Sequence, residues 1–232
     1  DSKMYILKNV LYRILSDPTL VSNMRLALAT FDQIGPQAVD PSDNWYRWPP
    51  QTSGTKQRLY WHSDYSKPDN RHAKLQENFD STTNATHLSN IKKWFDGEDD
   101  SDHRELRFHG GTPLKDSIFH SRKSSAKSFF QGKDKNGEDV VSEPCQDNWL
   151  IVVSDGADSW ETNLDKVAES VKNLYGVFDG KTKRKIKTFV IGIMDPTVPS
   201  QRNFAIMLSK MADYGDNGVL DQNYGYSWTY KD

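Results

Sequence analysis

A threonine hydroxyl and an aspartate carboxylate are the side chains of this sequence best suited to chemistry. Asp155 stands in the triplet Ser-Asp-Gly that ends the apolar run Trp149–Val153. Thr112 stands in the stretch Gly110–Leu114, directly ahead of a proline. A hydroxyl and a carboxylate are hard oxygen donors, which suit Mg²⁺ or another divalent cation such as Mn²⁺ or Ca²⁺. We therefore take Thr112 and Asp155 as candidate metal ligands.

Each of these residues also has a simpler possible role. Asp155 can fill a turn or cap the helix that follows it, and Thr112 can cap the helix that begins at Pro113. Both alternatives stay open on residue spacing alone. An octahedral ion held by few protein groups keeps a position open to water or to the carboxylate of a ligand.

The elements that position these residues alternate between helices and strands. Hydrophobic periodicity predicts helices at 2–16, 114–129, 164–174 and 204–215, and strands at 24–31, 149–153 and 185–193, with a last strand or hairpin near 219–230. This alternation predicts an α/β fold with an open, mainly parallel sheet and helices on both faces, in one domain over 1–232. The unbroken apolar run of the 149–153 strand is typical of a strand buried on both faces. Right-handed crossovers would bring the strand-end loops to one rim.

Residues 40–108 differ in character from the rest of the chain. Prolines and glycines interrupt this segment, and its aromatic residues are clustered among polar ones. Its aliphatic content is too low for an independent core, so we interpret it as a long irregular insertion, with a helical piece at His87–Phe95. The aromatic cluster is either a small satellite core or a stacking surface.

The composition and the absence of several motifs exclude other classes of protein. A net charge of −2 with interspersed acids and bases argues against a nucleic-acid-binding protein. One cysteine, Cys145, excludes an internal disulfide, and no apolar run is long enough to span a bilayer. Five of the six histidines fall between His62 and His109 without zinc-ligand spacing. Asp134, Asn136 and Asp139 superficially resemble a calcium loop, but they do not fit EF-hand spacing. No phosphate-binding glycine loop or nucleophile elbow is present.

The order of the motifs resembles that of a von Willebrand factor A domain. A helix, a strand ending T-F-D, then G-G-T-P-L opening a helix and a strand ending S-D-G follow one another as in that family. The resemblance implies a metal-ion-dependent adhesion site, with Thr112 as its second motif and Asp155 as its third. More narrowly, G-G-T-P-L followed by P-C-Q-D-N at 144–148 resembles the PilY/PilC family of type IV pilus tip proteins.

The chain departs from this family pattern at the first metal motif. The motif D-x-S-x-S ends the family's first strand, yet only Asp1 and Ser2 precede the first predicted helix here. We therefore expect the first strand and its ligands to be missing from this stretch, which leaves the metal site incomplete. Ser154 stands where the family usually has threonine. Any disulfide of Cys145 must reach outside the stretch.

The resemblance implies a non-enzymatic adhesion or pilus-assembly module on the bacterial surface, extracellular and periplasmic in transit. Its partners would be pilin, a pilus-associated subunit, or a host or matrix ligand, bound through the divalent ion. Two alternatives remain. One is a metal-dependent hydrolase that uses Asp155, with His109 as base. The other is a metal-free structural module with the same fold.

Overall fold

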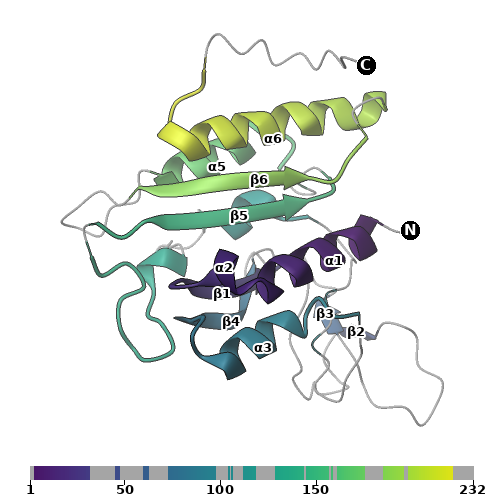
Figure 1. The fold of residues 1–232 in the computed structure, drawn as a ribbon. Coiled ribbons are helices and arrows are strands. Elements are labelled where there is room, and N and C mark those ends of the chain that lie inside the picture. Colours follow the sequence, from purple (N-terminus) through teal and green to yellow (C-terminus); the bar gives the residue numbers. More distant parts are fainter. Residues whose placement is uncertain are drawn as a thin grey trace. The chain divides into compact units, whose positions relative to one another are not determined.

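The computed structural model describes the chain as two compact units (Figure 1). The described residues are 3–31, 45–47, 60–62, 73–97, 104, 106, 112–118, 129–143, 145–156, 158, 161–175, 185–195 and 198–221. Unit 1 comprises Asp1–Gly110 and Lys133–Glu138, and unit 2 comprises Gly111–Gly132 and Asp139–Asp232. Each unit is therefore considered by itself.

The described residues of unit 1 form three helices and two antiparallel strand pairs. Its elements are α1 (Lys3–Ser16), α2 (Pro18–Val21), β1 (Arg25–Thr30), β2 (Trp45–Arg47), β3 (Tyr60–His62), β4 (Lys74–Ser81) and α3 (Ala85–Lys92). β1 pairs with β4, and β2 pairs with β3. The helix predicted at 2–16, the strand predicted at 24–31 and the helical piece at His87–Phe95 are confirmed. Asp32, which follows β1, lies outside the described residues.

Short polar side chains set the beginnings of two unit 1 helices. The Asp17 carboxylate accepts the amide hydrogen of Thr19 at 2.8 Å, so Asp17 both follows the end of α1 and caps α2. The Asn84 side chain accepts the amide hydrogens of Thr86 at 3.1 Å and His87 at 3.3 Å, which caps α3. Such caps satisfy amides that have no acceptor inside the helix.

The core of unit 1 draws on the segment interpreted as an insertion. Ile91, Trp94 and Phe95 are buried together, and the leucines that pack against them are Leu11, Leu15, Leu26, Leu28 and Leu106. β4 lies in the same segment and was not predicted, because its sequence K-L-Q-E-N-F-D-S contains only two hydrophobic residues. Residues 73–97 are therefore an integral part of unit 1.

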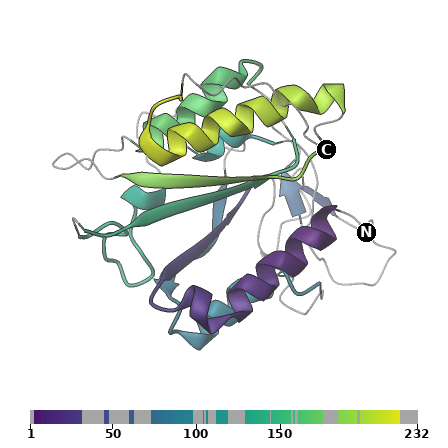
Figure 2. The same cartoon turned by 45° about the horizontal axis from the view of Figure 1, so that its top comes forward.

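Unit 2 is built on a parallel pair of strands. Its elements are α4 (Leu114–Ile118), a 3₁₀ turn (Phe129–Gln131), β5 (Asn148–Ser154), α5 (Leu164–Tyr175), β6 (Ile186–Gly192) and α6 (Pro199–Asn217). β5 and β6 pair in parallel from Asn148 opposite Ile186 to Ser154 opposite Gly192. The two views of Figures 1 and 2 show α5 and α6 on the same side of this pair. The strands predicted at 149–153 and 185–193 and the helices predicted at 164–174 and 204–215 are confirmed. Of the helix predicted at 114–129, only Leu114–Ile118 is described as α-helix; Phe129 lies in the 3₁₀ turn, and residues 119–128 lie outside the described part of the chain.

The β5–β6 pair has one buried and one exposed face. The buried members of the pair are Asn148, Val152, Ser154, Ile186 and Thr188, and α5 and α6 both contact β6. On the other face Trp149 and Phe189 stack at 4.9 Å between ring centroids, and they remain 45% and 55% exposed. Ile151 on the same face is 59% exposed. β5 therefore alternates between buried and exposed residues, and the expectation of burial on both faces is not met.

The coarse fold class is confirmed, since the described residues form a mixed α/β structure. Two of the described strand pairings are antiparallel and one is parallel. The last strand expected near 219–230 falls mostly outside the described residues, which end at 221. No helix within the described ranges is long and apolar enough to cross a membrane.

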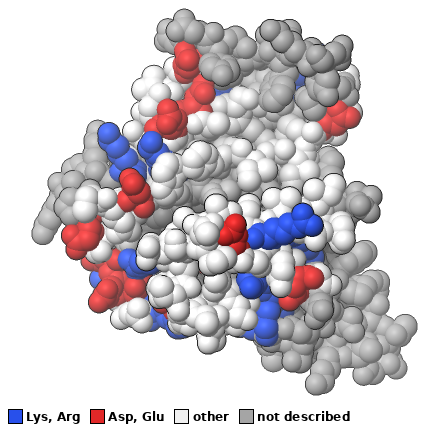
Figure 3. Space-filling view, viewed as in Figure 1, with Lys and Arg blue, Asp and Glu red and all other residues white. Residues whose placement is uncertain are grey.

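Charged side chains are interspersed on the surface, as the sequence predicts. On the face drawn in Figure 3, blue and red side chains of the described residues are scattered among uncharged ones. Several form ion pairs within one unit, such as Arg104 with Glu77 at 3.0 Å and Lys210 with Asp165 at 2.6 Å. The Lys210–Asp165 pair, whose Asp165 side chain is exposed, contributes about 0–1 kcal/mol to stability.

Gly215 allows α6 to approach β6 closely. A Cβ atom at this position would lie 2.3 Å from the backbone oxygen of Thr188. The sequence predicts a helix end near Gly215, but α6 continues to Asn217, and Gly218 terminates it with a left-handed φ of 78°. Gly215 therefore serves packing rather than helix termination.

We expect Gly215→Ala to destabilise the protein. Alanine favours a helix over glycine by about 1 kcal/mol. The clash with Thr188 forces α6 away from β6, and such overpacking costs about 1–3 kcal/mol. Urea unfolding followed by circular dichroism should show a lower midpoint. Asp216→Ala, at the exposed neighbouring position of the same helix, is the control and should leave the midpoint nearly unchanged. A midpoint raised by Gly215→Ala would contradict the packing role.

Candidate functional site

Thr112 directly precedes α4, as the sequence predicts. Its backbone oxygen accepts the amide hydrogen of Leu114 at 3.0 Å, and Ser117 donates to the Pro113 oxygen at 2.9 Å. Leu114 and Ile118 are buried and anchor the short helix in unit 2. The Thr112 side chain is partly buried at the start of this anchored turn.

Asp155 lies at the carboxyl end of β5 and is exposed. The turn around it is held by Ser154, whose hydroxyl donates to the Gly156 oxygen at 3.0 Å. The Ser154 backbone oxygen accepts the amide hydrogen of Ile193 at 2.9 Å. Within the described part of the chain, the Asp155 carboxylate makes no hydrogen bond or ion pair. The hydrogen bonds of Ser154 therefore stabilise this turn, and the Asp155 carboxylate remains accessible to a ligand.

A third residue, Asp158, joins the segments that contain Thr112 and Asp155. One of its carboxylate oxygens accepts the amide hydrogen of Lys115 at 2.8 Å. The other accepts the amide hydrogen of Glu161 at 2.8 Å. Lys115 follows Thr112 by three residues and Asp158 follows Asp155 by three residues. The two candidate ligands are therefore carried by loops that share one bridging carboxylate.

Glu161 and Asn163 continue this connection to α5. Glu161 accepts a hydrogen bond from the Lys115 ammonium at 2.6 Å and another from the Asn163 amide at 3.1 Å. Asn163 in turn accepts the amide hydrogens of Asp165 at 3.1 Å and Lys166 at 3.4 Å. We call Asp158, Glu161 and Asn163 the loop clamp.

The surroundings of Glu161 in the loop clamp favour its ionised form. The Lys115 ammonium and the Asn163 amide hydrogen lower the pKa of Glu161 below its ordinary value, against the opposing effect of burial. Hydrogen bonds to an ionised acceptor are shorter and stronger than those between neutral groups. Asn163, rather than Asp155, caps α5, and Asp158 bonds to the first turn of α4.

The oxygen donors of Thr112 and Asp155 suit a hard cation but supply only part of a coordination shell. Mg²⁺ prefers six oxygen ligands in octahedral geometry, so water or a partner would have to provide most of them. Within the described ranges, no group of three or more His, Cys, Asp or Glu side chains could hold a metal ion. His109, the base considered for a hydrolase, lies outside those ranges. His87 is buried, and its ring Nε2 lies 3.0 Å from the Leu26 oxygen.

Gln146 and Asn148 of the P-C-Q-D-N stretch have structural roles. The Gln146 side chain donates to the Val140 oxygen at 2.8 Å and to the Asn148 side-chain oxygen at 2.9 Å. Asn148, which is buried, donates back to the Gln146 backbone oxygen at 3.0 Å. These bonds fix the chain where it enters β5. Cys145 beside them is exposed and free.

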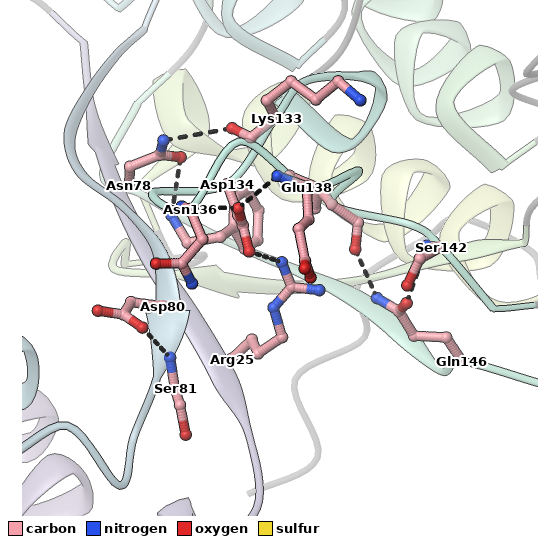
Figure 4. Close-up of polar contacts among 12 residues, drawn as sticks. Arg25, Asn78, Asp80, Ser81, Lys133, Asp134, Asn136, Glu138, Ser142 and Gln146 are labelled. Atoms are coloured by element: carbon pink, nitrogen blue, oxygen red, sulfur yellow. Dashed lines mark hydrogen bonds and ion pairs between the residues drawn. The ribbon is translucent and has the colours of Figure 1, made fainter.

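The loop of Asp134, Asn136 and Asp139, which superficially resembles a calcium site, is held by hydrogen bonds between protein groups (Figure 4). One oxygen of Asp134 accepts the amide hydrogens of Asn136 at 2.8 Å and Glu138 at 2.9 Å. The other accepts a hydrogen bond from the Arg25 guanidinium at 2.6 Å. Gly137, with φ of 82°, lets the backbone turn here. The Asp134 carboxylate thus holds this loop against β1 within unit 1.

Comparison with known proteins leaves the family open, since no family model, curated protein or solved structure matches this chain.

We expect Asp134→Asn to lower the free energy of unfolding relative to wild type at neutral pH. In acid the difference between the variant and wild type should be smaller. Burial alone would raise the pKa of Asp134, but the Glu138 and Asn136 amide hydrogens and Arg25 outweigh it and depress that pKa. The unfolded carboxyl has a pKa of about 3.9. Stabilisation by the ionised form is therefore present above that pH and is lost as pH falls through the folded pKa.

Urea midpoints of wild type and Asp134→Asn, measured at neutral pH and down to about pH 3, test this expectation. The control is Glu138→Gln, which changes an exposed side chain of the same loop but keeps the amide hydrogen that Asp134 accepts. A difference between wild type and Asp134→Asn that stays constant across this pH range would contradict it.

Proposed function

We propose that this chain is a von Willebrand factor A-like adhesion module of the bacterial surface, acting at the tip or in the assembly of type IV pili. In this proposal the open, mainly parallel sheet of that fold presents a divalent cation on its rim. Thr112 and Asp155 are two of the ligands of the cation. A protein partner or matrix ligand contributes a carboxylate to a remaining position.

One observation carries the proposal: Asp155 is exposed without a partner in the described chain, on a loop joined to the Thr112 loop through Asp158. The order of the motifs gives further support. G-G-T-P-L precedes α4, P-C-Q-D-N leads into β5, and S-D-G ends β5. The parallel β5–α5–β6 unit is of the kind found in α/β folds that bind ligands at the carboxyl ends of strands.

The charge of Asp155 determines how an acidic partner could bind in this proposal. A cation is needed because Asp155 would otherwise repel an acidic partner. With few protein ligands, the ion binds weakly by itself and more tightly when a partner carboxylate completes its shell. In this proposal the protein is not an enzyme and is displayed outside the cell after passage through the periplasm.

A second candidate function is a metal-free packing module with the same fold. The exposed apolar face of β5 and β6 favours it, because Trp149, Ile151 and Phe189 together present a large apolar surface. A subunit of an assembly could bury this face against another protein without any ion. The two functions differ in whether Asp155 contributes to partner binding.

Titration with Mn²⁺ under observation of backbone amide signals by NMR tests the proposed site, because paramagnetic broadening reports even weak binding. We expect amides around Thr112 and Asp155 to broaden first, and Asp155→Asn to abolish this effect by removing the charged ligand. Asp147→Asn, a change of an exposed acid at the opposite end of β5, is the matched control and should leave the broadening intact. Broadening spread evenly over exposed carboxylates would contradict the site.

A further inference from the structure

The loop clamp connects two parts of unit 2 that are 43 positions apart in sequence, the start of α4 and the loop that leads from β5 into α5. We propose that Asp158 and Glu161 are positioning residues, which couple the loops of Thr112 and Asp155 to the first turn of α5. The coupling itself follows from the hydrogen bonds of the clamp. Its effect on metal and partner binding rests on the function proposed above.

The clamp is a continuous series of acceptor groups. Asp158 accepts from the backbone amides of Lys115 and Glu161, both at 2.8 Å. Glu161 accepts from the Lys115 ammonium and from the backbone of Asn163. Asn163 accepts from the first amides of α5. Each of Glu161 and Asn163 thus donates its own backbone amide to the preceding acceptor of the clamp, so the displacement of one residue disturbs the bond to the next.

Burial distinguishes the clamp from an ordinary surface ion pair. The Lys115 and Glu161 side chains are 19% and 15% exposed, and most donors of the clamp are backbone amides. The Lys210–Asp165 pair of the same unit has the same 2.6 Å separation, but Asp165 is 67% exposed. A partly buried carboxylate that holds amide hydrogens constrains the backbone, whereas an exposed pair constrains mainly its own side chains.

The clamp acts on the rim through short lengths of chain. Thr112 is separated from Lys115 only by Pro113 and by Leu114, which is buried and begins α4. The bonds that hold Lys115 therefore also restrict the position of Thr112. Asp158 limits the loop after Asp155, whose own carboxylate has no partner in the described chain. Energetic coupling between two sites is reciprocal, so a ligand on the rim would in turn stabilise the start of α5.

Amide hydrogen exchange on the whole chain tests the coupling without any metal. In Asp158→Asn we expect exchange to accelerate about tenfold at Lys115 and Glu161, because each loses a bond to a charged acceptor. The decisive amides are those of Asn163 and Lys166, which do not contact Asp158 and should also accelerate. Lys210→Met, which breaks the exposed ion pair of the same length, should leave all four unchanged.

Two results of this exchange experiment would overturn the proposal. In the first, exchange accelerates only at Lys115 and Glu161, which would mean that each bond of the clamp acts alone. The second result combines two observations. In Asp158→Asn the amides of α6 also exchange faster, which would indicate a general loss of stability. In Glu161→Gln, which preserves the shape of the side chain, the exchange of the Lys166 amide does not accelerate. Acceleration of Lys166 in Glu161→Gln with α6 unchanged would instead support the coupling.

The Mn²⁺ titration repeated on Asp158→Asn tests the positioning of the rim. We expect broadening to persist near Asp155 and to weaken several-fold near Thr112, because the two loops are no longer tied together. Undiminished broadening at Thr112 would show that the clamp does not position the site. No broadening in the wild type would contradict the proposed function, and the exchange rates would then decide the coupling by themselves.

Discussion

The parallel pairing of β5 and β6 is the constraint on which the rest of unit 2 depends. A tight turn cannot join parallel strands, so the chain must leave the end of β5, run back through α5 and enter β6 from the same end as β5. The loop after Asp155 therefore has to connect a strand end to a helix start. Its backbone amides need acceptors, and Asp158, Glu161 and Asn163 supply them. The polar groups of the rim thus follow from the crossover.

Much of this fold could be predicted because the information lies within a few residues. The apolar runs of β1, β5 and β6 and the 3.6-residue periodicity of α1, α5 and α6 appear directly in the sequence. The Thr-Pro pair indicates the start of α4, and the Ser-Asp-Gly triplet indicates the end of β5. The placement of Thr112 and Asp155 relative to these elements was accordingly predictable.

The remaining features depend on contacts between distant residues. Asp158 and Lys115 are 43 positions apart, and no local pattern indicates that an acid in one loop will bond to the first turn of another helix. β4 has a mostly polar sequence and is recognisable as a strand only through its pairing with β1. Gly215 resembles a helix terminator in sequence, and only the proximity of Thr188 reveals its packing role.

The two units are interleaved in the sequence. Lys133–Glu138 belongs to unit 1, although Gly111–Gly132 before it belongs to unit 2. This late segment supplies the Asp134 carboxylate to Arg25 and the Lys135 ammonium to Asp80. A single break in the backbone cannot release unit 1 with both of these contacts intact. A boundary drawn after Gly110 would therefore cost unit 1 these contacts, so a fragment of unit 1 that keeps them has to extend at least to Glu138.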